Sequence, residues 1–249
     1  MSQYAVGITT DINYYKHAKV LIKSILCHNS DIDISYKCVG FTPDIEFHKS
    51  VKTYIDMTPL SKKKTFLMKG VDVMHPRMSS LRSRMCSEQV LYTVHDKYWH
   101  LLYLLKQGYE KIIITDADCI VRGDLTEIFD SLDDNDLSMQ FHKGSFPFIG
   151  NKVVLAEGFI VCRNNKIVES FFKRVTEEII KAKKESRYDI DTDTEVIVKL
   201  HEQETIKVKN LPIKYKDCKN LSNTSIVWSG QGATKSAPLY INEALKYEN

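Results

Sequence analysis

The chain has 249 residues, 43% of them hydrophobic, which is enough to bury one sizeable core and excludes a disulfide-stabilised mini-protein or a disordered tail. Its 35 Lys and Arg nearly balance 32 Asp and Glu, so the net charge of +3 does not by itself indicate a nucleic-acid-binding protein. No run approaches the roughly 18 apolar residues of a membrane span, and residues 1–10 do not resemble an export signal. We therefore expect a soluble, cytoplasmic protein.

The six cysteines are scattered and form neither a CxxC pair nor a Cys/His cluster with zinc spacing. Without an export signal, they are expected to be reduced thiols of the core. Three disulfides are the alternative that an even count allows. The residues are Cys27, Cys38, Cys86, Cys119, Cys162 and Cys218.

Expected strands and helices alternate along the chain. Short apolar or β-branched runs predict strands at residues 4–9, 32–41 and 112–114. Helices are expected where apolar residues recur at 18–25, over 96–107 before Gly108, from an N-cap at Asp124, and over about 166–184. This alternation predicts one α/β domain with a mostly parallel sheet flanked by helices, which binds ligands at the carboxyl ends of its strands.

The most informative segment follows the apolar run at 112–114, where Asp116 and Asp118 flank the small residue Ala117. In an extended segment these two carboxylates would point the same way and would repel each other unless a proton or a cation neutralises them. A hard divalent ion that also binds a diphosphate would meet this need. The alternative is a surface turn in which each aspartate caps the next element.

This arrangement resembles the Asp-x-Asp signature of glycosyltransferases with the Rossmann-like GT-A fold, and the start of the chain is similar to that of glycosyltransferase family 8. The resemblance implies that 1–249 is a single GT-A domain. It also implies that the strand end and loop bind a uridine nucleotide, with a tyrosine ring stacked on the base. The positions that inherit these donor-binding roles are Thr9, Thr10, Asp11, Tyr14, Asp116 and Ala117.

Residues 228–235 resemble the closing His-x-x-Gly-x-x-Lys motif of the same family. There the histidine is the third protein ligand of the metal and the lysine binds the diphosphate. Gly232 and Lys235 fit the motif, whereas Ser229 stands where the histidine should be. A serine hydroxyl is a poor ligand for Mn²⁺, so the ion would bind more weakly, take a water there, or depend on Asp116, Asp118 and the diphosphate.

Two further segments match the family by position. The strand 157–163 resembles the one behind the sugar pocket, with Gly158 allowing close backbone approach. The acidic segment 189–195 corresponds to residues that contact the sugar, with Asp193 as the best candidate for a catalytic residue and Asp189 as the second. A solvated loop is the main alternative, and a calcium loop is disfavoured. Lys97 corresponds to a basic residue that reaches the sugar nucleotide.

The stretch at about 57–90 has no counterpart in this resemblance and is rich in lysine, arginine and methionine. We interpret it as a basic insertion that is either a solvated loop or a lid over bound substrate. Part of its charge, over 60–90, could face an anionic acceptor such as DNA, a phosphorylated glycan or lipid headgroups.

The sequence thus predicts a glycosyltransferase that uses Mn²⁺ or Mg²⁺. It would move a sugar from a nucleotide-sugar donor, most simply UDP-linked, to a hydroxyl of a glycan, a protein or modified DNA, and the family implies retention of configuration. A catalytically decayed nucleotide-sugar-binding module is the second hypothesis, motivated by Ser229. A nucleotidyltransferase is disfavoured because residues 7–14 contain no glycine-rich phosphate loop.

Overall fold

The computed structural model describes residues 2–44, 48–62, 64–66, 85–143, 153–190 and 192–248. Most of the expected basic insertion at 57–90 lies outside these residues, and so does Asp191 of the acidic segment.

A seven-stranded sheet forms the centre of the described structure, in the order β10-β8-β9-β6-β1-β2-β3. Four neighbouring pairs are parallel, whereas β9 runs antiparallel to both β6 and β8. The mostly parallel α/β fold predicted from the sequence is therefore confirmed. The strands are β1 (Tyr4–Asp11), β2 (Asp33–Val39), β3 (Val51–Asp56), β6 (Lys111–Thr115), β8 (Leu137–Lys143), β9 (Val153–Arg163) and β10 (Val208–Asn210).

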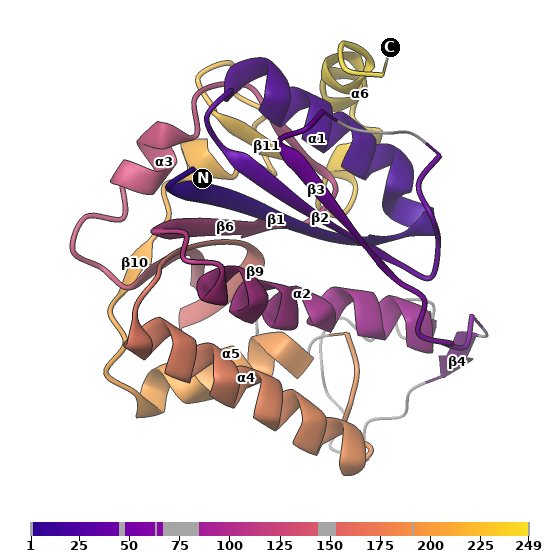
Figure 1. The fold of residues 1–249 in the computed structure, drawn as a ribbon, viewed down its shortest axis with the longest axis vertical. Coiled ribbons are helices and arrows are strands. Elements are labelled where there is room, and N and C mark those ends of the chain that lie inside the picture. Colours follow the sequence, from indigo (N-terminus) through magenta and orange to yellow (C-terminus); the bar gives the residue numbers. More distant parts are fainter. Residues whose placement is uncertain are drawn as a thin grey trace.

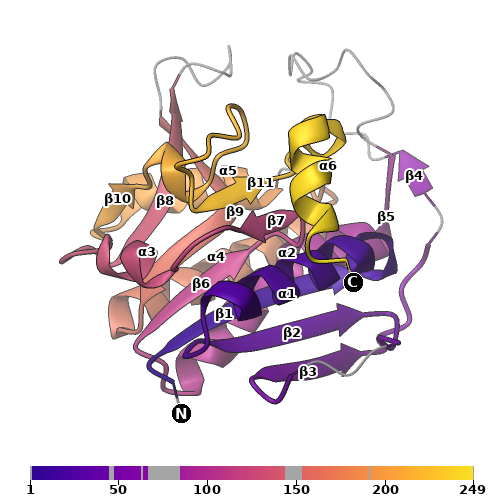
Figure 2. The ribbon, with the colours of Figure 1, turned by 90° about the horizontal axis from the view of Figure 1, so that it is seen from above.

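Two short antiparallel pairs lie outside the central sheet. β7 (Cys119–Val121) follows β6 after a turn and pairs with β11 (Val227–Ser229), so a segment near the end of the chain reaches the end of β6. β4 (Lys64–Phe66) pairs with β5 (Met85–Ser87). Figure 2 shows β7 and β11 on the same side of the sheet as α1 and α6.

Helices cover both faces of the sheet. α1 covers one face, and α2, with α4 and α5 beyond it, covers the other (Figure 1). The helices are α1 (Tyr15–His28), α2 (Glu88–Lys106), α3 (Thr126–Asp130), α4 (Lys166–Lys184), α5 (Thr192–Gln203) and α6 (Pro238–Leu245), with short 3-10 helices at Ile12–Tyr14, Ile213–Tyr215 and Thr234–Ser236.

Alternating side chains of the central strands divide the core into two layers. In β6, Ile113 packs on the α1 side, whereas Ile112 and Ile114 pack on the side of α2 and α4. Because both faces are covered, these strands carry apolar residues at consecutive positions, which is typical of buried parallel strands.

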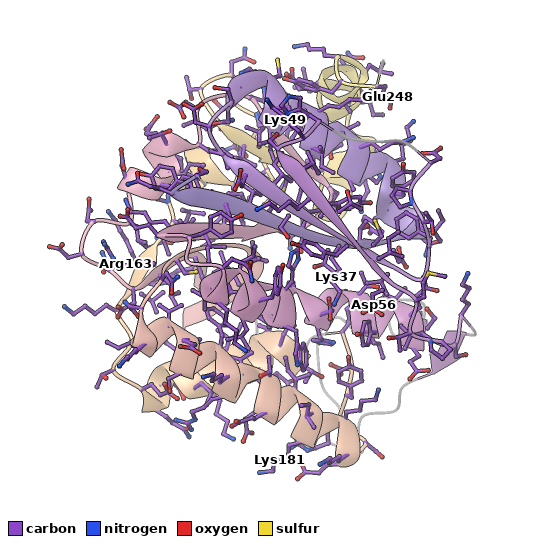
Figure 3. The ribbon with its side chains drawn as sticks, in the orientation of Figure 1. Lys37, Lys49, Asp56, Arg163, Lys181 and Glu248 are labelled. Atoms are coloured by element: carbon purple, nitrogen blue, oxygen red, sulfur yellow. The ribbon has the colours of Figure 1, made fainter. Side chains whose placement is uncertain are left out.

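An ion-pair cluster fixes the edge strand β3 to the sheet. Nζ of Lys37 in β2 lies 3.3 Å from Oδ2 of Asp56 in β3 and 2.8 Å from Oδ2 of Asp96 in α2. Figure 3 shows Lys37 and Asp56 pointing toward each other. The cluster joins two strands and a helix at the edge of the sheet.

Several expected boundaries need correction. The helix expected over 96–107 begins at Glu88, where Ser87 caps it. The helix expected from Asp124 is a single turn at 126–130, in which Oδ1 of Asp124 accepts a hydrogen bond from the Thr126 amide. The helix 166–184 matches its prediction, and Gly108 adopts the expected positive φ of 85° after α2.

The described cysteines are free thiols, and those of Cys38, Cys119 and Cys162 are buried as expected. Cys27 is exposed, so its assignment to the core is wrong; it lies on the outer surface of α1. Among the described residues, no helix has the length and apolar composition needed to cross a membrane.

Candidate functional site

The candidate site lies where β1 and β6 end side by side. The two strands are parallel, with Ile8 opposite Thr115, so the residues that follow them emerge at the same edge. This is the carboxyl edge at which open α/β sheets bind ligands. The structure thereby brings Asp11 and Asp116, which are far apart in the sequence, to one edge of the sheet.

Asp116, Ala117 and Asp118 form a turn between β6 and β7, not the extended segment expected from the sequence. The side chain of Asp116 is 48% exposed, whereas that of Asp118 is 10% exposed. The turn is fixed by its backbone, since the Asp116 amide donates to the Gly158 carbonyl (3.0 Å) and the Asp118 carbonyl accepts from the Gly230 amide (2.6 Å). The two carboxylates consequently have different neighbours.

On the α1 side, Lys235 joins Asp118 to Tyr14. Nζ of Lys235 donates to Oδ2 of Asp118 (3.0 Å) and to the Tyr14 hydroxyl (2.9 Å), and it lies 4.6 Å from the centre of the Tyr14 ring. Tyr14 is 41% exposed, so it is not a core residue under the first helix. Three residues that the sequence assigned to one donor site are therefore in contact.

On the α2 side, Lys97 joins Asp116 to Asp193. Its Nζ lies 3.9 Å from Oδ1 of Asp116 and 3.3 Å from Oδ2 of Asp193. Asp193 belongs to the first turn of α5, not to a solvated loop, and has no exposed surface. Its carboxylate also accepts from the Tyr98 hydroxyl (2.9 Å). Asp193 thus contacts Lys97 directly, and the described structure gives it no open route to a sugar.

Charges and burial act against each other in this cluster. Burial acts to raise the pKa of Asp193, but Lys97 and His95 outweigh it, so the pKa lies below the usual value. Burial is the largest cause that raises the pKa of Asp116; Lys97 opposes this increase and Asp118 adds to it. The charged form of the Asp116 carboxylate is therefore stabilised by positive charge nearby.

The other expected donor-binding residues lie at the end of β1. Thr10 and Asp11 are buried, and Asp11 caps the following 3-10 helix by accepting from the amide of Asn13. The Thr9 hydroxyl forms a hydrogen bond with Nδ1 of the buried His100 (3.0 Å). These contacts position the backbone that leads into Tyr14. Asp189 accepts a hydrogen bond from the Thr192 hydroxyl just before α5.

The segment 229–232 is placed beside Asp118 by the pairing of β11 with β7. Ser229 is opposite Cys119 and is 1% exposed. A side chain at Gly230 would meet the Asp118 carbonyl at 2.9 Å, so only glycine allows this approach. Gly232 has a φ of +63°, a backbone conformation that favours glycine, and it lies in the turn that leads to Lys235.

The donor atoms of this site fit a hard divalent cation that is held partly by its substrate. Asp116 and Asp118 offer carboxylate oxygens, which Mg²⁺ and Mn²⁺ prefer, and such ions commonly take one or two carboxylates together with phosphate oxygens. Among the residues that the structure describes, no group of three or more His, Cys, Asp or Glu side chains is arranged so that it could hold a metal ion by itself. Ser229 lies next to the site but adds only a hydroxyl.

Sequence reasoning missed Lys216, which follows the 3-10 helix Ile213–Tyr215 and is 2% exposed. A Cβ on Gly158 would lie 2.9 Å from its Nζ and would overlap Oδ2 of Asp116. The surrounding sequence is polar, with Lys214, Asp217 and Lys219 nearby, and reads as a solvated loop. Only the contact between distant segments reveals this lysine.

Solved structures with the same fold include several glycosyltransferases. GlyE of Streptococcus pneumoniae TIGR4 has 15% identity and a TM-score of 0.62, and the match covers 100% of this chain and 60% of that one. The galactosyltransferase LgtC, solved with donor and acceptor sugar analogues, has 14% identity and a TM-score of 0.56, covering 97% and 95%. The bifunctional glycosyltransferase WbbM has 14% identity and a TM-score of 0.60, covering 99% and 50%.

The present chain thus spans about 60% of the length of GlyE. A search of curated protein sequences found no match. The model of glycosyl transferase family 8 matches residues 5–209, which is most of the sequence. Together with the sheet order and the site at the end of β6, this match establishes that the chain belongs to glycosyl transferase family 8.

Proposed function

We propose that this protein is a metal-dependent glycosyltransferase that moves a sugar from a UDP-sugar to an acceptor hydroxyl with retention of configuration. The observation that carries the proposal is the turn after β6, where Asp116 and Asp118 each face a lysine and Tyr14 lies beside Lys235. Carboxylates, an ammonium group and an exposed aromatic ring are the groups needed to bind a divalent cation, a diphosphate and a base.

In this proposal, each residue acts on one part of the donor. Tyr14 stacks on the uracil ring, and the backbone of Thr9, Thr10 and Asp11 borders the nucleoside. Ala117, which stands between the two aspartates in the sequence, anchors the turn because it is buried in the core on the α1 side. The exposed ring of Tyr14 supports this arrangement, because a stacking platform has to be open to its ligand.

The chemistry centres on the diphosphate. Asp116 and Asp118 would hold Mn²⁺ or Mg²⁺, with Ser229 or water completing the shell, and the ion would neutralise charge on the leaving diphosphate. The bond between the anomeric carbon and the diphosphate oxygen breaks, the acceptor oxygen bonds to the same face of that carbon, and the acceptor proton passes to an oxygen of the departing diphosphate. Lys235 leaves Asp118 to bind the departing phosphate oxygens, which stabilises the negative charge as it develops.

Asp193 has a different role in this proposal from the one expected. Because it is buried and bonded to Lys97 and Tyr98, we infer that it positions Lys97 at the donor site. Asp189, which is only partly buried, remains the candidate for contact with the sugar or the reacting carbon. The proposal also includes an anionic acceptor, which the basic stretch 60–90 would bind.

The test is release of UDP from a panel of UDP-sugars with Mn²⁺, with EDTA and with the variant Asp118→Asn. We expect slow release with Mn²⁺, loss with EDTA, and at least about 100-fold slower release by Asp118→Asn without a change in melting temperature. The matched control is Asp124→Asn, since Asp124 is exposed and its carboxylate accepts a hydrogen bond from the Thr126 amide, away from the site. Near-normal release by Asp118→Asn would contradict the proposal.

Ser229 gives one reason to consider a second function, a binding module that retains the donor pocket without catalysis. Ser229 lies opposite Cys119, the residue after Asp118, at the position where the family has a histidine ligand, and a hydroxyl weakens the protein's share of the metal shell. The same assay separates the two functions. A binding module would bind UDP in the presence of Mn²⁺ but release no UDP from any donor.

A further inference from the structure

Lys216 is a buried lysine whose backbone is fixed at both ends. Its amide donates to the Ile213 carbonyl (3.1 Å), and its carbonyl accepts from Nε2 of the buried Gln140 in β8 (2.6 Å). The amide of the next residue, Asp217, donates a hydrogen bond to the Val227 carbonyl (2.8 Å). With its backbone held in this way, Lys216 presents its side chain to a fixed place in the fold.

That place is beside Asp116 in the candidate donor site. A Cβ on Gly158 would lie 2.9 Å from Nζ of Lys216 and would overlap Oδ2 of Asp116, so both charged groups pack against the bare Cα of Gly158. Within the described residues, no hydrogen bond or ion pair within 4.0 Å engages Nζ of Lys216. The stem of Lys216 is enclosed, while Nζ is not sealed from solvent.

An ammonium group on an enclosed stem keeps only part of its water shell and therefore gains from an anionic partner. A ligand can supply that partner. Nζ of Lys216 lies beside the exposed carboxylate of Asp116, so the ligand has to satisfy a cation beside an anion. A phosphate group shared between the ammonium and the metal site meets that requirement.

Positive charge is present in the cluster before any ion binds. Among the described side chains around the turn, three ammonium groups lie near three carboxylates. The groups are Lys97, Lys216 and Lys235, and Asp116, Asp118 and Asp193. A diphosphate approaching this cluster would not meet the repulsion that two bare carboxylates would produce.

We propose that Lys216 is an anion-binding residue of the donor site, and that its ammonium lets the site bind a diphosphate without a divalent cation. The inference rests on the proposed function, which it deepens by assigning a second fixed cation to the diphosphate. It also accounts for the weak third ligand at Ser229, because fixed positive charge supplies part of what a tightly bound ion would supply.

The experiment is calorimetric titration of inorganic pyrophosphate into the full chain in EDTA and in Mn²⁺. The variants are Lys216→Met, which keeps the length of the buried stem, and Lys214→Met as a matched control, since Lys214 is 46% exposed and pairs with Glu127 on the surface. Wild type and Lys214→Met should bind pyrophosphate in EDTA. Lys216→Met should bind it at least about tenfold more weakly, with a smaller difference in Mn²⁺.

A thermal melt separates this role from a structural one. Because removal of a charge without a contacting partner does not break an ion pair, Lys216→Met should melt at or above the wild-type temperature. Lys216→Gln repeats the test if the methionine variant does not fold. Equal binding by wild type and variant in EDTA, or no binding by wild type in EDTA, overturns the proposal for Lys216.

Failure of the proposed function would give a different pattern. If no UDP-sugar releases UDP but pyrophosphate binding in EDTA still depends on Lys216, the anion site stands and the transferase assignment falls. If UDP is released but Lys216→Met binds pyrophosphate like wild type, the reverse holds. The two assays therefore judge the two proposals separately.

Discussion

Replacement of Gly158 by alanine adds one methyl group where β9 passes beneath Asp116. The new Cβ would overlap Oδ2 of Asp116 and lie 2.9 Å from Nζ of Lys216, whereas ordinary contact begins at 3.4 Å. Both neighbours are ends of side chains, so the strand can keep its path. We expect the carboxylate to move by about 1 Å, and a displacement of that size at a reacting centre commonly costs about 100-fold in rate.

The effect of Gly158→Ala on the free energy of unfolding should be small. Alanine restricts the unfolded chain more than glycine does, which is worth about 0.5–1 kcal/mol in a strand. That gain offsets part of the strain from moving two side chains. Gly158→Ala should therefore melt near the wild-type temperature while UDP release from a UDP-sugar in Mn²⁺ falls about 100-fold.

The matched control is Gly123→Ala, because a Cβ there would meet only Ile226 at 3.6 Å, which is ordinary contact. This variant should release UDP at the wild-type rate. If Gly158→Ala kept wild-type release within a few-fold, the carboxylate of Asp116 would not need its observed position. The assignment of the turn after β6 as the reactive site would then be wrong.

Two further outcomes follow from the same structure. Tyr14→Ala should weaken UDP binding by about 1–3 kcal/mol because a stacking ring is lost, while Tyr14→Phe should stay near wild type in calorimetry; equal binding by the alanine variant would exclude the stack. Burial lowers the pKa of His100 to about 3, so only the unfolded chain takes up this proton between pH 6.5 and 3. The stability that neutral His100 contributes is complete above pH 6.5 and decreases as the pH falls. From pH 7 to pH 5, wild type should lose about 2 kcal/mol more in urea unfolding than His100→Gln, and an equal loss would contradict the assignment.

Local patterns in the sequence predicted most of the elements that build the site. The apolar run at 112–114 is a buried strand, and the helix 166–184 has its expected bounds. These two predictions are correct because a strand buried on both faces leaves a continuous apolar run in the sequence and an amphipathic helix leaves a periodic one. The start of α2 was missed by eight residues, because the apolar spacing used for the prediction begins only at Asp96.

The sequence by itself indicated the family, the alternation of strands and helices and several of the residues that gather at the end of β6, because motif spacing and hydrophobic period are local properties. The tertiary structure alone decided that Asp193 is enclosed behind Lys97 and that Lys216 lies beneath Asp116. Burial of a charge depends on which distant segments pack around it, and a polar stretch such as 214–219 has the same composition in solvent or under a ligand site. Contacts across the sheet, between β9, β11 and the turn at 116–118, therefore set the electrostatics on which the proposed chemistry depends.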